Sequence, residues 1–366
     1  MLNVRFCAAA VGGCLSLGSF SMAAPMYSLD PLTSFGGGDG YLAPGERAYL
    51  TTDNTQRGLA YNPINDHVYI VNRAGGLSVQ VLDGTTGADL GTLNTTGITG
   101  GTFVLSTIAV AEDGAIYAAN LTTNSSSSPL KIYRWNDELS APTVAFSGGP
   151  VGAVGARFGD NLAARGSGAS TQLLMGGNNG AGAGSITYNS YAVFSTADGV
   201  SFGGTGMSIT GPANGSHRLG IAFAAGNTVY GKQTGAASNL EFSTFDLALG
   251  TASRNSGAPF TLTASGEALL AVDVANTLLA TTDISSGMIR LYDILDNTVN
   301  PVLLDSEAFP GTHNANTNGT GQMVFGNGRL YVLESNNGVR VFAVVPEPSG
   351  LTVLGLGLSL LRRKRC

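Results

Sequence analysis

Residues 58–93 contain the pattern that decides the fold: Gly58-Leu59-Ala60-Tyr61-Asn62-Pro63, then His67-Val68-Tyr69-Ile70-Val71, then Leu77-Ser78-Val79-Gln80-Val81-Leu82-Asp83, then Asp89-Leu90-Gly91-Thr92-Leu93. The third run alternates apolar and polar residues, which marks a strand with one buried face. Asn-Pro and Asp-Gly pairs stand between the runs and are turn signals. One repeat therefore consists of short strands joined by turns.

This repeat recurs along the chain. Short apolar segments with a large central residue occupy residues 67–71, 115–119, 171–175, 228–232, 277–281 and 329–333. Their central residues are 48, 56, 57, 49 and 52 apart. A period near fifty with β character throughout is typical of propeller blades. We predict an all-β chain with a six-bladed β-propeller, its repeats spanning residues 57–344.

The ends of the repeat array set the domain boundaries. We assign residues 24–45 to an amino-terminal linker and residues 46–344 to the propeller. The last repeat stops at Val344 without an outer strand, and residues 46–52 are expected to supply it. Joining the two ends in this way removes the exposed sheet edges of an open array. A seven-bladed ring that uses residues 25–52 more fully, or a β-sandwich array, also fits the pattern.

Two stretches resemble known propeller repeats. Residues 57–93 resemble the repeats of bacterial surface proteins of the YVTN and NHL-like type, which implies a scaffold for binding, although propellers with this scaffold include enzymes. Ser195-Thr196-Ala197-Asp198-Gly199-Val200-Ser201-Phe202 resembles the Asp-box turn of sialidase-like propellers, with a different spacing. The resemblance implies a structural hairpin there.

The amino terminus has the order of a secretory signal peptide. Arg5 precedes an apolar stretch that ends near Phe20, and small residues follow. Cleavage between Ala23 and Ala24 fits best, which assigns residues 1–23 to the signal peptide. A buried amino-terminal helix, or lipoprotein processing at Cys14, are the alternatives.

The carboxyl terminus, residues 345–366, contains the triplet Pro346, Glu347 and Pro348, an apolar stretch, and the basic cluster Arg362, Arg363, Lys364 and Arg365. This order resembles the PEP-CTERM sorting domain that exosortases recognise. The prolines keep the triplet extended, and the basic cluster holds the end of the apolar span in the cytoplasm.

The apolar span of this tail is short. Residues 349–361 form a helix of about 20 Å, whereas the hydrocarbon core of a bilayer is ~30 Å thick. Such a span suits a transient stop before proteolytic transfer, and an ordinary membrane anchor is the alternative. The resemblance implies an exosortase-type enzyme and, before processing, the membrane as partners. It places the domain at the cell surface, outer membrane or extracellular matrix of a Gram-negative-type bacterium.

Charge and cysteine content agree with export. Residues 24–345 contain 13 Lys and Arg against 23 Asp and Glu, a net charge of about −10. Such a surface repels nucleic acid, so we expect no nucleic-acid partner. The three cysteines, Cys7, Cys14 and Cys366, lie in the two terminal segments. The propeller must therefore be stable without disulfides.

Residues that could carry chemistry are sparse. His67, His217 and His313 fall in different repeats, and we expect each to cap a strand or face water rather than bind metal. Gly-rich residues 176–184 are expected to form a flexible loop rather than a phosphate cradle. Aspartates near strand ends are expected to form turns rather than a calcium site; they are Asp83, Asp89, Asp113, Asp137, Asp246, Asp293 and Asp296.

Two functions remain open at this point. The first is a non-catalytic surface or matrix protein that contacts exopolysaccharide or other surface glycans, with a channel lined by small or aliphatic residues. The second is a carbohydrate-active hydrolase or lyase, with a carboxylate pair in a central cleft and one raised pKa. We favour the first because only 11% of the residues are charged. We accordingly expect no catalytic residue, no metal and no cofactor.

Overall fold

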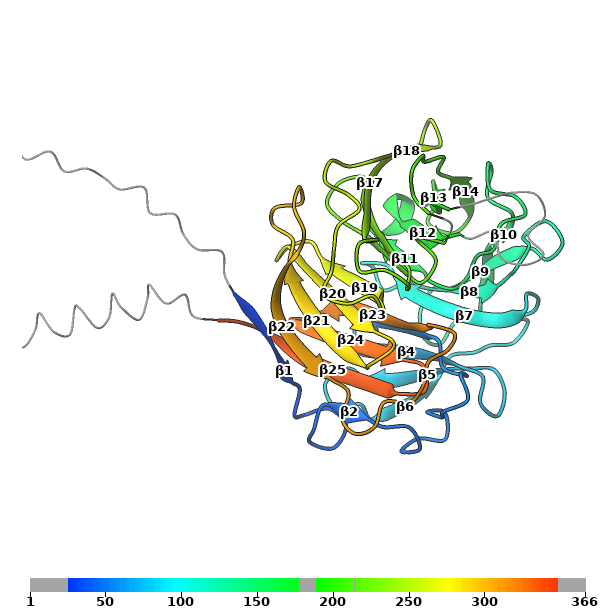
Figure 1. The fold of residues 1–366 in the computed structure, drawn as a ribbon. Helices are drawn as coiled ribbons and strands as arrows, with labels where there is room; N and C mark the ends of the chain where they lie inside the picture. Colours follow the sequence, from blue (N-terminus) through cyan, green and yellow to red (C-terminus); the bar gives the residue numbers. More distant parts are fainter. Residues whose placement is uncertain (1–25, 178–188, 214, 348–366) are drawn as a thin grey trace, which may run out of the picture. The chain divides into compact units, whose positions relative to one another are not determined.

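The computed structural model describes residues 26–177, 189–213 and 215–347. These residues form six antiparallel β-sheets, five of four strands and one of five, which follow one another along the chain as propeller blades (Figure 1). The predicted six-bladed all-β propeller is therefore confirmed. A single short 3₁₀-helix, η1 (Gly168–Ser170), interrupts the strands of the described ranges.

Each blade runs from an innermost to an outermost strand. Blades 1 to 3 are β3 (Gly58–Asn62), β4 (His67–Asn72), β5 (Ser78–Asp83) and β6 (Asp89–Thr92); β7 (Phe103–Val110), β8 (Ile116–Leu121), β9 (Leu130–Trp135) and β10 (Thr143–Gly148); and β11 (Ala163–Arg165), β12 (Gln172–Gly176), β13 (Tyr191–Thr196) and β14 (Phe202–Gly206). Blades 4 to 6 are β15 (Gly220–Phe223), β16 (Thr228–Lys232), β17 (Glu241–Asp246) and β18 (Thr251–Arg254); β19 (Glu267–Asp273), β20 (Leu278–Asp283), β21 (Met288–Asp293) and β22 (Val302–Ala308); and β23 (Gly321–Gly326), β24 (Arg329–Glu334), β25 (Gly338–Pro346) and β1 (Tyr27–Pro31).

The second strand of each blade carries the apolar segment on which the prediction rested. In β4, residues 68–71 are completely buried because both faces of the strand pack against neighbouring blades. Outer strands face solvent on one side and alternate, as β5 does between Val79, Gln80 and Val81. The number of buried faces therefore explains both sequence patterns. The second strand is buried on both faces and is continuously apolar, whereas the third strand is buried on one face and alternates with a period of two.

The core is divided into six apolar clusters, each between two adjacent blades. Between blades 6 and 1, the rings of Tyr61 and Tyr331 stack with centroids 5.2 Å apart. A Cβ atom on Gly326 would lie 2.1 Å from Cδ1 of Tyr61, so this joint requires glycine. Burying each large side chain contributes about 1.5–3 kcal/mol, and the ring is thus stabilised at every blade junction.

The strand that closes the ring differs from the predicted one. Blade 6 is completed by β1, which pairs with β25, and β2 (Tyr41–Leu42) pairs with β25 as well. The prediction that residues 46–52 supply this strand is wrong, because that segment forms turns. Its apolar Tyr49 and Leu50 are buried in the cluster between blades 6 and 1, which explains their strand-like pattern. The closing strands lie in residues 24–45, the segment assigned to a linker.

The Asp-box-like segment forms the β13–β14 hairpin, as predicted. The carboxylate of Asp198 accepts hydrogen bonds from the backbone N–H groups of Val200 and Ser201 at 2.8 Å and from the Thr196 hydroxyl at 2.9 Å. These bonds lower the pKa of Asp198 to about 2. The turn is structural, since every polar group named here is used within the hairpin.

Within residues 26–177, 189–213 and 215–347, no helix has the length and apolar character needed to cross a membrane. The predicted apolar span, residues 349–361, lies outside the described residues, as does the predicted signal peptide.

Candidate functional site

The innermost strands surround a central channel. Strand β3 contacts β23 and β7, β11 contacts β7 and β15, and β19 contacts β15 and β23. They enclose a cavity of about 300 Å³ whose wall is mainly small and aliphatic, with Leu59, Ile108, Leu162 and Ile221 among its residues. Glu112 is the one carboxylate among the described residues that line it.

Gln322 spans one end of this channel and links four blades. Its Nε2 donates hydrogen bonds to the carbonyls of Ile108 (2.6 Å) and Leu162 (2.8 Å). Its Oε1 accepts bonds from the Leu59 N–H (3.2 Å) and the Thr107 hydroxyl (3.1 Å). The amide of one side chain from blade 6 therefore satisfies backbone groups of blades 1 and 2 and of the segment that leads into blade 3.

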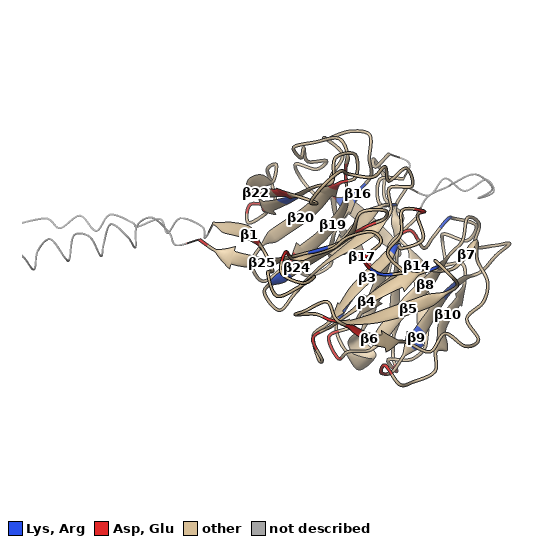
Figure 2. Ribbon diagram, turned by 90° about the horizontal axis from the view of Figure 1, so that it is seen from below, with Lys and Arg blue, Asp and Glu red and all other residues tan. Residues whose placement is uncertain are grey.

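All six innermost strands start at the end of the channel that Gln322 occupies, because they run side by side in the same direction around the axis. The loops between the second and third strands return to the same end, since these strands are antiparallel. We call this end the top face. Buried charged side chains gather there, Arg57, Lys232, Glu267 and Glu334 among them. Most of the ribbon belongs to residues without charge (Figure 2).

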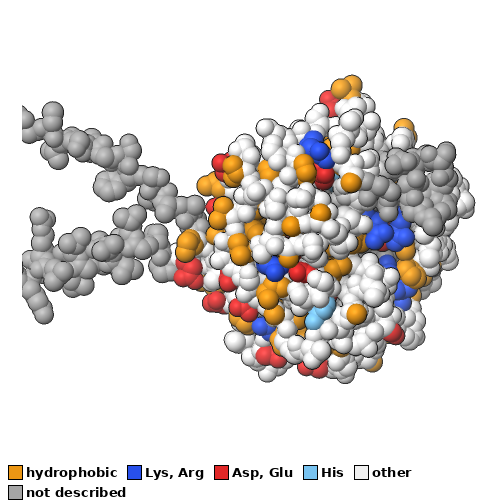
Figure 3. All heavy atoms as spheres, in the orientation of Figure 1, with side chains coloured by type: hydrophobic (Ala, Val, Ile, Leu, Met, Phe, Trp, Pro, Cys, Tyr) orange, Lys and Arg blue, Asp and Glu red, His pale blue; other side chains and the backbone are white. Residues whose placement is uncertain are grey.

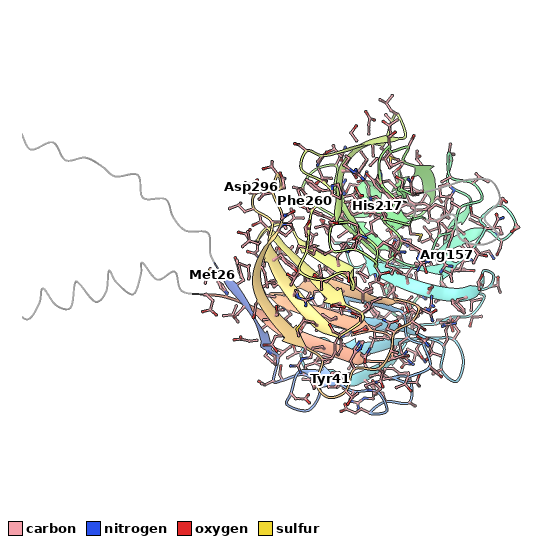
Figure 4. The ribbon with its side chains drawn as sticks, viewed as in Figure 1. Met26, Tyr41, Arg157, His217, Phe260 and Asp296 are labelled. Carbon is pink, nitrogen blue, oxygen red and sulfur yellow. The ribbon has the colours of Figure 1, made fainter. Side chains whose placement is uncertain are left out.

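One side of the top face carries four arginines, which we call the arginine cluster: Arg57, Arg73, Arg157 and Arg218. Arg57 directly precedes β3, Arg73 follows β4, and Arg157 and Arg218 precede β11 and β15. In the view of Figure 3, basic side chains gather on this face around the position that Figure 4 labels Arg157.

Aromatic and carboxylate groups hold part of this cluster in place. The guanidinium carbons of Arg57 and Arg73 lie 4.6 and 3.7 Å from the ring centroid of Phe103. Arg157 makes a two-pronged pair with Asp160, at 2.6 Å from Nε and 2.7 Å from Nη2. Nε of Arg218 lies 4.0 Å from the same carboxylate, which is longer than a hydrogen bond.

Arg57 is the least compensated member of the arginine cluster. Only 5% of the residue is exposed, and neither Nε nor Nη1 has a hydrogen-bond partner among the described residues. Burial, opposed by Asp160 and reinforced by the charges of Arg73, Arg157 and Arg218, lowers the pKa of Arg57 to about 10. The guanidinium remains charged at neutral pH, so a buried cation stands here without a hydrogen-bonding anion.

The opposite side of the top face, around Glu267, buries carboxylates instead, and we call it the carboxylate side. Glu267, at the start of β19, is fully buried. It accepts bonds from the Ala264 N–H (2.7 Å), from the hydroxyl of Tyr292 (2.9 and 3.1 Å) and from the hydroxyl of Thr281. Arg290 lies 3.4 Å away. Each oxygen of this carboxylate therefore has a donor within hydrogen-bond distance.

Lys232, at the end of β16, is the buried cation nearest to this side. Its ammonium group donates to the carbonyls of Gln233 (2.9 Å) and Ala236 (3.0 Å) and to the amide oxygen of Asn239. Burial lowers the pKa of Lys232 to about 8, although the charges of Glu267 and Asp283 oppose the shift. All three ammonium protons are thus used inside the protein.

Glu334 and His313 form an arrangement on this face that could transfer protons near neutral pH. The His313 Nε2 and a Glu334 carboxylate oxygen are 2.9 Å apart. Burial, partly offset by His313, raises the pKa of Glu334 to about 7. The Glu334 side chain is fully buried and that of His313 is 16% exposed. A substrate could reach this carboxylate only after the surrounding loops move.

The three histidines lie apart, and no group of three or more metal-ligating side chains occurs among the described residues. His67 pairs with Glu138 at 2.7 Å. The expectation that each histidine caps a strand or faces water is wrong for His217, which is fully buried against Tyr191. A Cβ atom on Gly231 would lie 2.0 Å from its ring, so the glycine of β16 makes room for it.

The strand-end aspartates form turns, as predicted. Asp83, Asp113, Asp137, Asp246, Asp293 and Asp296 each accept a hydrogen bond from a backbone N–H two or three residues later. Asp89 instead accepts a bond from the hydroxyl of Tyr49 and pairs with Arg47 at 3.2 Å.

The predicted sorting and cleavage residues fall at or beyond the edges of the described ranges. Pro346 ends β25 and is exposed, and the Glu347 N–H donates to the Met26 carbonyl at 2.6 Å. Pro348, Arg362, Arg363, Lys364, Arg365, Ala23 and Ala24 lie outside the described residues, as do residues 178–188 of the Gly-rich region.

Sequence reasoning did not identify the arginine cluster. A usable signal was present, because Arg57, Arg157 and Arg218 each stand within six residues of the start of an innermost strand. In a propeller, residues at the same position of each repeat meet at one end of the channel. Aligning the repeats by strand order would therefore have brought these arginines together.

Comparisons with known proteins support the fold. No curated protein matches the sequence. A PQQ-bound aldose sugar dehydrogenase from Streptomyces coelicolor is 17% identical, with a TM-score of 0.51, over 82% of this chain and 97% of that chain. A DUF4623 family protein from Bacteroides eggerthii is 16% identical, with a TM-score of 0.55, over 81% and 72%. At these identities the similarity concerns the fold alone. Residues 65–210, blade 1 from β4 onward through blade 3, match the family model described as "Domain of unknown function (DUF4623)".

Proposed function

We propose that this protein is an exported, non-catalytic propeller that binds surface or matrix glycans through its top face and is sorted by its PEP-CTERM-like tail. The observation that carries the proposal is the separation of the polar top face from the aliphatic channel by Gln322. Neutral hydrogen-bonding side chains are exposed or half-buried in the loops of this face, among them Ser126, Ser127, Gln233, Thr234 and Ser238. Hydroxyl and amide groups are suited to the hydroxyls of sugars.

Export is the second part of the proposal and rests on the sequence. The predicted signal peptide, the tail motif and the confinement of all three cysteines to the terminal segments favour it. The excess of acidic residues also favours a soluble surface protein that does not associate with nucleic acid.

Intact mass measures the sorting part directly. The protein is recovered from the cell surface and the culture medium, and compared with a variant in which Pro346, Glu347 and Pro348 are alanine. The expected wild-type mass lacks residues 1–23 and the residues after the triplet, while the variant keeps its tail. An intact carboxyl terminus in both proteins would contradict sorting.

A glycan array measures the binding part. Binding of the folded propeller to bacterial polysaccharides without release of reducing ends is the expected result. Release of new reducing ends or of unsaturated products would instead favour a carbohydrate-active enzyme. Glu334 and His313 are the residues that favour this second function, because burial raises the pKa of Glu334 to about 7 and the His313 ring lies 2.9 Å from its carboxylate. Loss of such activity in Glu334→Gln would assign it to this site.

A further inference from the structure

The arginine cluster combines two features that a purely structural group of charges does not need. It gathers four guanidinium groups from three segments far apart in sequence, and it leaves donors of a buried side chain unused. A buried charge without a hydrogen-bonding partner is costly, and stable proteins normally pair such groups. Arg57 therefore indicates a partner outside the described chain.

The charge balance shows what kind of partner fits. Asp160 lies between Arg157 and Arg218, and Asp53 favours the charge of Arg73. Four guanidinium groups thus face two carboxylates, in a protein whose sequence carries a net charge of −6. The remaining positive charge lies on Arg57 and Arg218, whose Nε atoms have no hydrogen-bond partner in the described part of the chain. The partner must bring negative charge and accept hydrogen bonds.

The neighbouring carboxylate also limits the partner. Guanidinium groups bind carboxylate, sulfate and phosphate alike through two parallel hydrogen bonds. Asp160 is fixed within 4.0 Å of Arg218 and would repel a doubly charged phosphate more than a singly charged group. The two-pronged contact between Arg157 and Asp160 shows how a guanidinium group of this cluster binds a carboxylate, and it already uses Nε and Nη2 of Arg157.

We propose that Arg57, Arg157 and Arg218 form a binding site for the carboxylate group of an acidic sugar, so that the top face selects uronate-containing polysaccharides. The choice of a sugar rests on the proposed function, whereas the choice of an oxyanion rests on the arginine cluster alone. Arg157 and Arg218, with side chains 20% and 23% exposed, receive the carboxylate at the surface, and Arg57 contributes charge from below.

Calorimetric titration with trigalacturonate tests the site, with maltotriose as the neutral sugar and sodium sulfate and sodium phosphate as inorganic anions. The titrations use the propeller purified from the culture medium or expressed as the full chain. We expect trigalacturonate to bind, maltotriose not to compete, and affinity to fall as salt is raised. Arg57→Met and Arg218→Gln should each weaken binding at least about tenfold, because each removes a charge-assisted contact.

Arg47→Gln is the matched control, since it removes one arginine charge at the pair with Asp89, away from the arginine cluster. It should leave the affinity unchanged. Circular dichroism and thermal unfolding verify that each variant is folded. If Arg57→Met does not fold, Arg57→Lys replaces it as the test. Lysine keeps the positive charge but lacks the planar guanidinium that donates two parallel hydrogen bonds, so this variant should also weaken binding.

Three results would overturn the proposal: no binding of trigalacturonate, equal binding in wild type and in both arginine variants, or binding of sulfate and phosphate in its place. The outcomes separate the two proposals. Neutral glycans that bind independently of Arg57 and Arg218 would leave the proposed function standing without the site. Binding of trigalacturonate through the arginines by a protein that is not exported, or that cleaves polysaccharide, would leave the site standing without the proposed function.

Discussion

Arg57, in the arginine cluster, and Glu267, on the carboxylate side, lie on the same face of one propeller, yet their buried charges are compensated to very different degrees. Glu267 is fully buried and is surrounded by donors from Ala264, Thr281 and Tyr292. Arg57 is almost as buried but leaves two of its nitrogens without a partner among the described residues. Both charges stand at the start of an innermost strand, so their position in the fold does not explain the difference.

The comparison separates groups that stabilise the fold from groups that are available to a ligand. Removing a fully paired buried group leaves its partners unsatisfied, which costs free energy of unfolding. Removing an unpaired buried charge relieves a desolvation cost. Measurements of unfolding free energy on single variants can therefore test, without any ligand, whether a buried charged group stabilises the fold or is available to bind a ligand.

The largest effect is expected at Glu267. Glu267→Ala leaves the Ala264 N–H and the Thr281 hydroxyl without their acceptor and removes the carboxylate that lies 3.4 Å from Arg290, and should lower the free energy of unfolding by about 3–5 kcal/mol. Urea unfolding followed by circular dichroism measures it. Glu46→Ala, an exposed control, should change stability by less than about 0.5 kcal/mol. A loss below about 1 kcal/mol at Glu267 would show that its bonds are not used in solution.

Gln322 gives the next largest effect. Gln322→Ala removes five hydrogen bonds to buried groups of blades 1 and 2 and of the segment before blade 3, and should cost about 3 kcal/mol. Gln80→Ala is the control, because the one hydrogen bond of that side chain to a described residue is to Ser78. Hydrogen exchange should also show faster exchange at the Leu59 N–H in Gln322→Ala, since Oε1 accepts from this group.

Glu334 makes stability depend on pH. Its pKa is raised in the folded protein from 4.5 to about 7 by burial, so the folded state binds this proton more tightly than the unfolded state. The stabilisation is complete below about pH 4.5 and is lost as the pH rises to about 7, by about 3 kcal/mol in total. Glu334→Gln is neutral at every pH and removes this loss.

The measurement is the difference in unfolding free energy between Glu334→Gln and wild type from pH 4.5 to 7.5, in which titrating groups that do not contact Glu334 cancel. The variant should gain relative to wild type as the pH rises. His217 acts with the opposite sign, because burial lowers its pKa to about 4 and stability is lost as the pH falls from 6.5. The unfolding free energy of Glu334→Gln, taken by itself rather than relative to wild type, should therefore decrease as the pH falls below 6.5. A difference independent of pH would contradict the assignment to Glu334.

Features that depend on local sequence patterns can be predicted from this sequence, whereas features that depend on long-range pairing cannot. Blade number and most strand positions follow from local patterns, since a run such as residues 67–71 is apolar for the same reason that β4 is buried on both faces. The closing strand does not follow from a local pattern. Tyr49 and Leu50 look like a strand because they are buried, while Tyr27–Pro31 forms one through pairing with β25, more than 300 residues away.

The candidate site was less accessible from sequence for a related reason. An arginine before a strand is unremarkable by itself, and Arg57, Arg157 and Arg218 become a group only when the ring brings blades 1 to 4 together. Pairing is also invisible in a sequence: Glu267 and Arg57 are both single charges beside glycine, Gly266 and Gly58. Only the hydrogen bonds distinguish the compensated group from the uncompensated one.

The smallest effect, and the one that decides the comparison, is expected at Arg57. Arg57→Met keeps the length of the side chain, removes an uncompensated charge and loses a cation–π contact with Phe103 worth about 0.5–2 kcal/mol. Relief of desolvation offsets that loss, so stability should change by less than about 1 kcal/mol. Arg254→Met is the contrasting variant, since it breaks a two-pronged pair with buried Glu241 and should cost about 3 kcal/mol. If instead both variants lost equal stability, Arg57 would be a structural residue like Arg254, and its unused donors would no longer indicate a ligand.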